Sequence, residues 1–340
     1  MDRRGWALWS RRELLGGLAT VGAGGLLNLT PETASAEPPP ETTTLRLIKI
    51  TGTCTAPQYV ADDLLKGEGF GRVEYVPSQA GIPTARTLAS GQADISMNFV
   101  APSIIRIDAG DPIVLLAGIH VGCFELFGTQ RVRQITDLRG KTVAVQSLGS
   151  SQQIFLASMA AYVGLDPQRD IKWVARSSPE GVRLLADGKI DAYMAFAPEQ
   201  QEIRAKKIGH VVVNSAADHP WSQYFCCAAV GNRNFVQRNP VATKRAVRAI
   251  LKAADICAVQ PERAARAVVT KGFYRNYDYT LQTLRELSYR QWRTYDPEDA
   301  VRFWALRLRE ARVVKGTPQK IIAEGTDWRF FNELKKELKA

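Results

Sequence analysis

Short apolar runs alternate with helical patterns over most of the chain after residue 44. Such runs are typical of strands buried on both faces, and the segments between them are long enough for crossover helices. The alternation predicts an α/β fold with parallel sheets covered by helices. The expected strands are Leu45–Ile50, Val73–Val76, Ile95–Phe99, Ile113–Ala117, Thr142–Val145, Ile171–Val174, Ala192–Ala195 and Val211–Val213, and the expected helices are Ala56–Lys66, Ile82–Ser90, Gln152–Val163 and Pro179–Asp187.

Two similar segments, LASGQADISM and LLADGKIDAYM, lie at equivalent places in two halves of this pattern. Each ends a helix with a glycine, Gly91 or Gly188, and then leads through an aspartate into the third strand of its half. The repetition predicts two similar α/β lobes. After Tyr224 the apolar spacing becomes helical, so we expect the C-terminal part to be mostly helical and to pack on one lobe.

The first 36 residues have the features of an export signal. A basic start precedes the apolar run LLGGLATVGAGGLL, which is too short to span a membrane, and small residues ending at Ala36 form a cleavage site. Arg11-Arg12 fits a twin-arginine signal, and an ordinary Sec signal is the alternative. We expect residues 1–36 to be removed, residues 37–44 to form a leader, and the protein to be periplasmic.

The chain has a net charge of +11, but it contains no run of five or more basic residues, so we expect no nucleic-acid partner. Its five cysteines form no CxxC pair, and its three histidines are not at metal-ligand spacing. We therefore expect no metal and no cofactor. Cys54 and Cys123 both follow expected strands of the first half, and whether they form a disulfide stays open.

The stretch DLRGKTVAVQSLGSSQQIFLAS contains two candidate phosphate-binding features. Gly140-Lys141-Thr142 precedes its strand, whereas a nucleotide-binding P-loop follows one, so we interpret it as a turn. Ser147, Ser150 and Ser151 do follow a strand and open a helix, where free backbone N–H groups can bind an anion. The alternative is that Ser150 or Ser151 only caps the helix.

Other strand ends carry similar small and polar loops, which describes a cleft between two lobes rather than an enzyme site. No Ser-His-Asp triad, carboxylate pair or Cys-His grouping is recognisable among them, so we expect no catalytic residue.

The segments APQYVADDLLKGEGF, TLASGQADISM, DLRGKTVAV, LLADGKIDAYMAFAPE and RNPVATKRAVRAILKAADICAVQPERAA occur in this order across residues 45–265. On these segments the chain resembles bacterial solute-binding proteins of ABC importers, of the nitrate/sulfonate/taurine group, which share a fold with thiamine-pyrimidine synthases. The resemblance implies a two-lobed type II periplasmic binding protein fold. Lobe one is then 45–125 plus 226–340, lobe two is 126–225, and the crossing strands lie near 124–131 and 224–230.

Ligand contacts carried over from the family fall on the loops after the expected strands and on the second-lobe helix start. They are Thr53, Cys54, Gln58, Tyr59, Asn98, Ser147, Ser150, Ser151, Phe196 and Glu199. The positions of strand ends add His120 and Trp221, for which packing in the core is the alternative. Glu199, if it faces the cleft, favours a cationic or hydroxylated ligand instead of an anion.

The resemblance implies a monomeric receptor that captures a small anionic solute and delivers it to the permease and ATPase subunits of an importer. The alternatives are an enzyme like the pyrimidine synthases, or a solute-binding partner of a membrane sensor.

Overall fold

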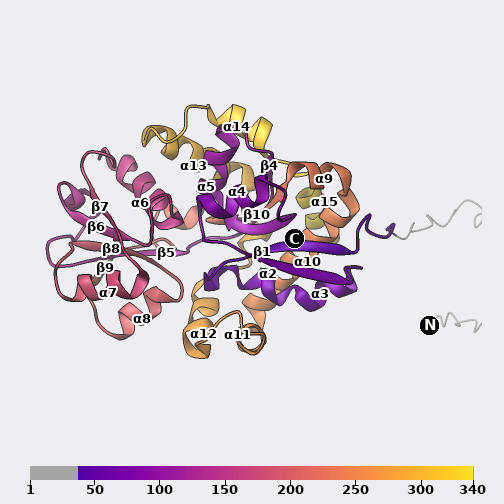
Figure 1. Ribbon diagram of the computed structural model, residues 1–340, viewed down its shortest axis with the longest axis horizontal. Helices are drawn as coiled ribbons and strands as arrows, with labels where there is room; N and C mark the ends of the chain where they lie inside the picture. The colour runs from indigo at the N-terminus through magenta and orange to yellow at the C-terminus, as the bar shows by residue number, and fades with distance from the viewer. Residues whose placement is uncertain (1–36, 340) are drawn as a thin grey trace, which may run out of the picture. The chain divides into compact units, whose positions relative to one another are not determined.

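The computed structural model describes residues 37–339, so the predicted signal at residues 1–36 lies outside the described residues. Within them the strands form two five-stranded sheets (Figure 1). The first sheet has the order β2-β1-β3-β10-β4, with β1 Thr44–Lys49, β2 Arg72–Pro77, β3 Ile95–Phe99, β4 Ile113–His120 and β10 Cys227–Asn232. The second has the order β7-β6-β8-β5-β9, with β5 Phe124–Gly128, β6 Thr142–Val145, β7 Lys172–Ala175, β8 Ala192–Phe196 and β9 His210–Asn214.

Each sheet contains one strand that runs against the other four. Strand β10 pairs antiparallel with β3 and β4, and β5 pairs antiparallel with β8 and β9. These two strands occupy most of the expected crossing segments. The connections between the sheets lie directly before them, at residues 121–123 and 215–226.

Helices cover both sheets and define two lobes. The first lobe is the first sheet with α2 Ala56–Val60, α3 Asp62–Gly67, α4 Ile82–Ala89, α5 Val100–Asp108 and the C-terminal helices; the second is the second sheet with α6 Ser151–Tyr162, α7 Ser178–Ala186 and α8 Glu199–Ala205. The C-terminal helices are α9 Arg233–Arg238, α10 Pro240–Val259, α11 Pro261–Thr270, α12 Tyr277–Glu286, α13 Pro297–Glu310, α14 Pro318–Gly325 and α15 Arg329–Glu337.

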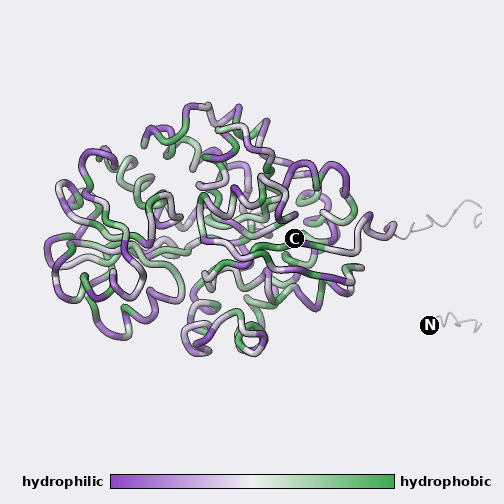
Figure 2. The backbone as a smooth tube through the Cα atoms, in the orientation of Figure 1, coloured by the Kyte–Doolittle hydropathy of each residue, from purple (hydrophilic) through white to green (hydrophobic). Residues whose placement is uncertain are grey.

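The chain shows clear local reasons for these elements. Helix α10 begins at a proline, and the Glu41 carboxylate accepts hydrogen bonds from the Val241 and Ala242 N–H groups in its first turn. The hydrophobic segments in Figure 2 follow the strands, and the hydrophilic ones gather on the outer helices. Within residues 37–339, no helix combines the length and apolarity needed to cross a membrane.

The sequence predicted this architecture well. All eight expected strands and the expected crossover helices are present, with Ala56–Lys66 divided into α2 and α3. The α/β fold with two mainly parallel sheets is confirmed. The lobe boundaries at residues 125 and 225 stay a prediction.

The internal repeat has a structural meaning in both lobes. Gly91 and Gly188 follow α4 and α7 with φ of 73° and 65°, which a glycine adopts without strain. Beyond them, the Asp94 carboxylate accepts the Arg46 N–H of β1 at 2.8 Å, and the Asp191 carboxylate accepts the Thr142 N–H of β6 at 2.8 Å. Each aspartate therefore holds the first parallel strand of its own lobe, which is β1 in the first lobe and β6 in the second.

Candidate functional site

The two lobes meet at the carboxyl ends of their parallel strands. The Thr53 N–H, in the turn after β1, donates to the Ala197 carbonyl after β8 at 3.1 Å. Gly81, at the start of α4, forms an isolated β-bridge with Ser150 at the start of α6. Ligands of open α/β sheets bind at such strand ends, so this boundary is the candidate site.

Four phenylalanines pack across this boundary. Phe99 of the first lobe lies 5.0 Å from Phe124 and 6.4 Å from Phe196, measured between ring centroids. Phe155 of α6 lies 4.6 Å from Phe124. All four side chains are at most 4% exposed. Only Phe196 was predicted, because the other three look like ordinary core residues in the sequence.

Several buried polar side chains along the same boundary have no hydrogen-bond partner among the described residues. The orphaned atoms are Thr53 Oγ1, Asn98 Oδ1, Ser151 Oγ and both amide atoms of Gln152. A buried polar group without a partner costs about 1–3 kcal/mol. These atoms therefore have unused hydrogen-bonding capacity, and Gln152 is a member of the set that the sequence did not indicate.

The three serines of the loop before and at the start of α6, Ser147, Ser150 and Ser151, differ in how their hydroxyl groups are used. Ser150 is the N-cap of α6, since its hydroxyl accepts the Gln153 N–H at 3.4 Å, so the capping alternative holds for this residue. Ser147 is half-buried, and its carbonyl accepts the Ser150 N–H. Ser151 carries the orphaned hydroxyl of this loop.

Gln58 and Tyr59 are buried and hold strand ends. Gln58 donates to the Ile48 carbonyl at 2.6 Å and accepts the Met97 N–H at 2.7 Å, which joins β1 to β3. The Tyr59 hydroxyl donates to the carbonyl of Ile50 and accepts its N–H, both at 2.9 Å. Their polar groups are already used by the protein.

Glu199 and Trp221 also have partners within the protein. The Glu199 carboxylate accepts the Tyr193 hydroxyl at 2.8 Å, and burial raises the pKa of Glu199. Trp221 is 3% exposed and stacks near Trp304, at 6.2 Å between ring centroids, in an aromatic cluster with Phe155 and Phe303. The core alternative given for Trp221 agrees with this position.

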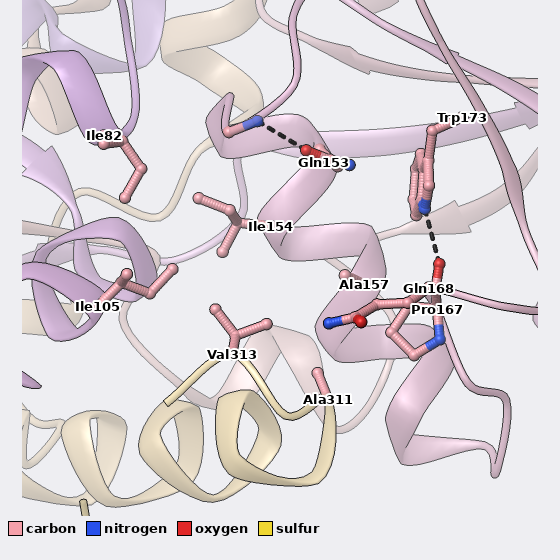
Figure 3. A pocket seen from close by; sticks show the side chains of 11 residues that line it. Ile82, Ile105, Gln153, Ile154, Ala157, Pro167, Gln168, Trp173, Ala311 and Val313 are labelled. Atoms are coloured by element: carbon pink, nitrogen blue, oxygen red, sulfur yellow. Dashed lines mark hydrogen bonds between the residues drawn. The ribbon is translucent and has the colours of Figure 1, made fainter. Parts of the chain in front are cut away.

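An apolar pocket of about 260 Å³ lies beside the serine loop, between the two lobes (Figure 3). Figure 3 shows Ile82, Ile105 and Val313 of the first lobe opposite Ile154 of α6. Its remaining lining residues are Gly149, Gln153, Ala157, Pro167, Gln168, Trp173 and Ala311. The Trp173 indole donates to the Pro167 carbonyl at 2.7 Å, which fixes one wall. The sequence did not indicate this pocket.

Two linked ion pairs also join the lobes, between α8 of the second lobe and α12 of the first. Arg204 of α8 contacts Glu125 of β5 at 3.0 Å and Glu286 of α12 at 2.6 Å. Glu125 is 1% exposed, and burial raises its pKa to about 7. Glu286 belongs to the first lobe, so these linked ion pairs cross the boundary between the lobes.

Cys54, His120, Cys123 and Cys227 are brought together in the first lobe and the adjoining connection. Their potential metal-ligand atoms all lie within 4.8 Å of one another, and all four residues are fully buried. Two of them, Cys54 and His120, were predicted as ligand contacts, whereas no metal site was expected. All five cysteines are free thiols.

The sequence model of the NMT1-like family matches residues 38–272. The periplasmic nitrate-binding protein of Synechocystis PCC 6803 is 15% identical, with a TM-score of 0.71 over 89% of this chain and 90% of its own. The alkanesulfonate-binding protein of Xanthomonas axonopodis pv. citri, bound to MOPS, is 15% identical, with a TM-score of 0.66 over 85% of this chain and 99% of its own.

The aliphatic sulphonate-binding protein of Escherichia coli is 17% identical, with a TM-score of 0.64 over 82% of this chain and 91% of its own. These similarities show the periplasmic binding protein fold. Among curated protein sequences, none matches the chain.

Proposed function

The chain belongs to the NMT1-like family, and from this premise we propose that it is the solute-binding component of an ABC importer. It captures a small anionic solute between its two lobes in the periplasm. It then presents the solute to a membrane permease that is driven by ATPase subunits. We expect it to act as a monomer.

The observation that carries this proposal is the set of orphaned polar atoms at the boundary between the lobes. Ser151 and Gln152 lie in the first turn of α6, where backbone N–H groups and the helix dipole favour a negative charge. Thr53 adds a hydroxyl from the opposite lobe. The two hydroxyls and the Gln152 amide N–H group are neutral donors that suit an anionic head group, whereas the orphaned oxygens of Gln152 and Asn98 only accept hydrogen bonds.

The aromatic residues and the pocket suit an apolar part of the solute. Phe99, Phe124 and Phe196 surround the boundary with apolar surface, and the pocket beside Gly149 offers further apolar walls. An anionic head on a short organic body, as in an alkanesulfonate, uses both features. The solute-binding structures that the chain is similar to include nitrate and sulfonate binders.

Binding in this class works by closing the lobes on the solute. The connections at residues 121–123 and 215–226 would act as the hinge. The hydrogen bond from Thr53 to Ala197 and the bridge from Gly81 to Ser150 then belong to the closed form. A solute that contacts both lobes stabilises this form by its differential affinity.

The test is a thermal-shift and calorimetric screen of nitrate, alkanesulfonates, carboxylates and pyrimidines. We expect an anionic class to raise the Tm and to be recovered chemically unchanged. Ser151→Ala should then weaken affinity by about 10- to 100-fold, as for a lost hydrogen bond to a charged group.

Ser158→Ala is the matched control, because Ser158 is buried on the same helix and donates to the Ile154 carbonyl. It should retain the affinity of the wild type. Chemical conversion of the solute would instead support an enzyme like the pyrimidine synthases. Co-purification with a membrane kinase rather than a permease would support the sensor alternative.

A further inference from the structure

Four potential metal ligands converge from distant points of the sequence. Cys54 lies in the turn after β1, His120 ends β4, Cys123 lies in the first connection between the lobes, and Cys227 begins β10. Their ligand atoms are within 4.8 Å of one another, and the Sγ atoms of Cys123 and Cys227 are 3.5 Å apart. In a tetrahedral zinc site with Zn–S bonds of ~2.3 Å, sulfur atoms lie roughly 3.8 Å apart. The cluster therefore needs little adjustment to hold one ion.

The orientation of His120 fits a metal ligand. Its Nδ1 lies 3.2 Å from the Val121 carbonyl, which assigns the proton to Nδ1 and leaves the Nε2 lone pair available. Nε2 is buried without a hydrogen-bond partner among the described residues. Metal-binding histidines usually donate their other N–H to a carbonyl or carboxylate in this way.

The surrounding structure holds the cysteine-bearing segments in place. The Tyr289 hydroxyl donates to the Cys54 carbonyl at 3.1 Å, and the Cys123 N–H donates to the Ser215 hydroxyl at 3.1 Å. All four candidate ligands are 0% exposed. The positions of the ligands are therefore set by backbone contacts that do not use the thiols.

We propose that Cys54, His120, Cys123 and Cys227 bind one Zn²⁺ ion in a closed tetrahedral site. Three thiolates and one imidazole are a donor set of structural zinc sites. Each cysteine that binds loses its Sγ–H proton to solvent as the Zn–S bond forms, so binding releases up to three protons per ion. Cys54 and His120, predicted from the sequence as solute contacts, would here act as metal ligands. The metal site does not depend on the proposed transport role.

The ion would join both connections between the lobes. Cys123 lies in the first connection, and Cys227 directly follows the second. Cys54 adds the turn whose neighbour Thr53 contacts Ala197 of the second lobe. A bound ion therefore fixes the hinge side of the first lobe while leaving the second lobe free to move.

The test uses the full chain, purified under reducing conditions without chelators. We expect about one zinc per chain by elemental analysis, and a Tm that rises with added Zn²⁺. Co²⁺ in place of zinc should give thiolate-to-metal charge-transfer absorption and the visible bands of tetrahedral cobalt. His120→Ala and Cys227→Ser should each lower zinc affinity by at least about 100-fold, beyond the loss typical of an outer-shell contact.

Cys257→Ser is the matched control, because Cys257 is also a fully buried free thiol but lies outside the cluster, on α10. It should keep wild-type zinc content and the cobalt spectrum. If the ligand variants do not fold, the cobalt spectrum and the zinc-dependent Tm of the wild type and Cys257→Ser still decide the matter.

Three outcomes would overturn the proposal. The first is reduced wild-type protein that takes up neither Zn²⁺ nor Co²⁺. The second is a disulfide between two of the three cluster cysteines in protein isolated from the exported fraction, shown by mass spectrometry of peptides. The third is a preference for Cu⁺ over Zn²⁺ in direct competition, which would overturn the assignment of the ion.

Discussion

The two lobes share a plan but differ where their antiparallel strands begin. In both, an aspartate after a glycine-ended helix holds the first parallel strand, through Asp94 in one lobe and Asp191 in the other. At β10 of the first lobe, however, Cys227 joins a buried cluster of thiols and an imidazole. At β5 of the second lobe, Glu125 joins a buried ion pair with Arg204.

This difference shows which parts of the repeat carry the fold and which carry particular chemistry. The aspartate contacts occur in both lobes, where each holds the first parallel strand. The starts of β5 and β10 adjoin the connections between the lobes, and each lobe uses that place differently. The first lobe places buried thiols and an imidazole there, and the second places a buried carboxylate whose pKa is about 7 beside an arginine.

The largest expected effect on stability comes from removing Arg204, the charge partner of the buried Glu125 in the second lobe. Arg204→Ala leaves Glu125 buried beside no guanidinium, so we expect the free energy of unfolding to fall by about 3–5 kcal/mol at about pH 8. Urea denaturation measures it. Arg285→Ala, which breaks an exposed ion pair with Glu262, should cost less than about 1 kcal/mol. Equal losses in the two variants would contradict a special role for the buried pair.

The next effect is the pH dependence of the same lobe. The pKa of Glu125 is about 7 in the folded protein against an ordinary 4.5, so the folded state binds more protons in this range. The stability from Glu125 is present below about pH 4.5 and is lost as the pH rises through about 7.

Relative to Glu125→Gln, which cannot ionise, the wild type should therefore lose up to about 3 kcal/mol of unfolding free energy between about pH 5 and about pH 8. Denaturation of both proteins across this range is the measurement. A constant difference between them would show that Glu125 does not titrate there.

The aspartate contacts that both lobes share should contribute similar amounts to the free energy of unfolding. Asp94→Asn and Asp191→Asn each weaken a backbone hydrogen bond and an arginine ion pair, so we expect a loss of about 1–2 kcal/mol in either lobe. The double variant should lose about the sum, since the sites lie in separate sheets. A loss confined to one lobe would mean that the repeat is not structurally equivalent.

The smallest effect concerns the link across the boundary. Glu286→Gln keeps Glu125 paired with Arg204 but weakens the contact with the first lobe, so the free energy of unfolding should change by less than about 1 kcal/mol. If the link favours the closed form, X-ray scattering should show a larger radius of gyration for this variant. An unchanged radius would limit the link to local packing.

Much of the fold could be predicted because parallel buried strands produce unmistakable apolar runs. The strand-end rule also led to Ser151, and the family resemblance led to Thr53 and Asn98; the orphaned atoms of all three now belong to the candidate site. Side-chain direction within short helices cannot be derived from sequence position, so the strand-joining bonds of Gln58 and Tyr59 were not foreseen.

The cysteine cluster escaped prediction for a different reason. Metal-site patterns in a sequence depend on ligands close together along the chain, whereas residues 54, 120, 123 and 227 meet only after the sheet of the first lobe has formed. The pocket beside the serine loop is likewise a product of tertiary packing, since its walls come from both lobes.

Gly81 allows the two lobes to approach each other closely at the boundary. Its φ is 111°, and a Cβ at this position would lie 2.8 Å from the Ser151 nitrogen and 2.9 Å from the Gly149 oxygen of the opposite lobe. A larger residue would strain the backbone at this φ and clash with the start of α6, so it should oppose the close approach of the two lobes. We expect Gly81→Val to favour the open form. It can therefore serve as the open-state control for a fluorescent sensor, in which the signal of a dye at the boundary changes on closure in the wild type and stays constant in the variant.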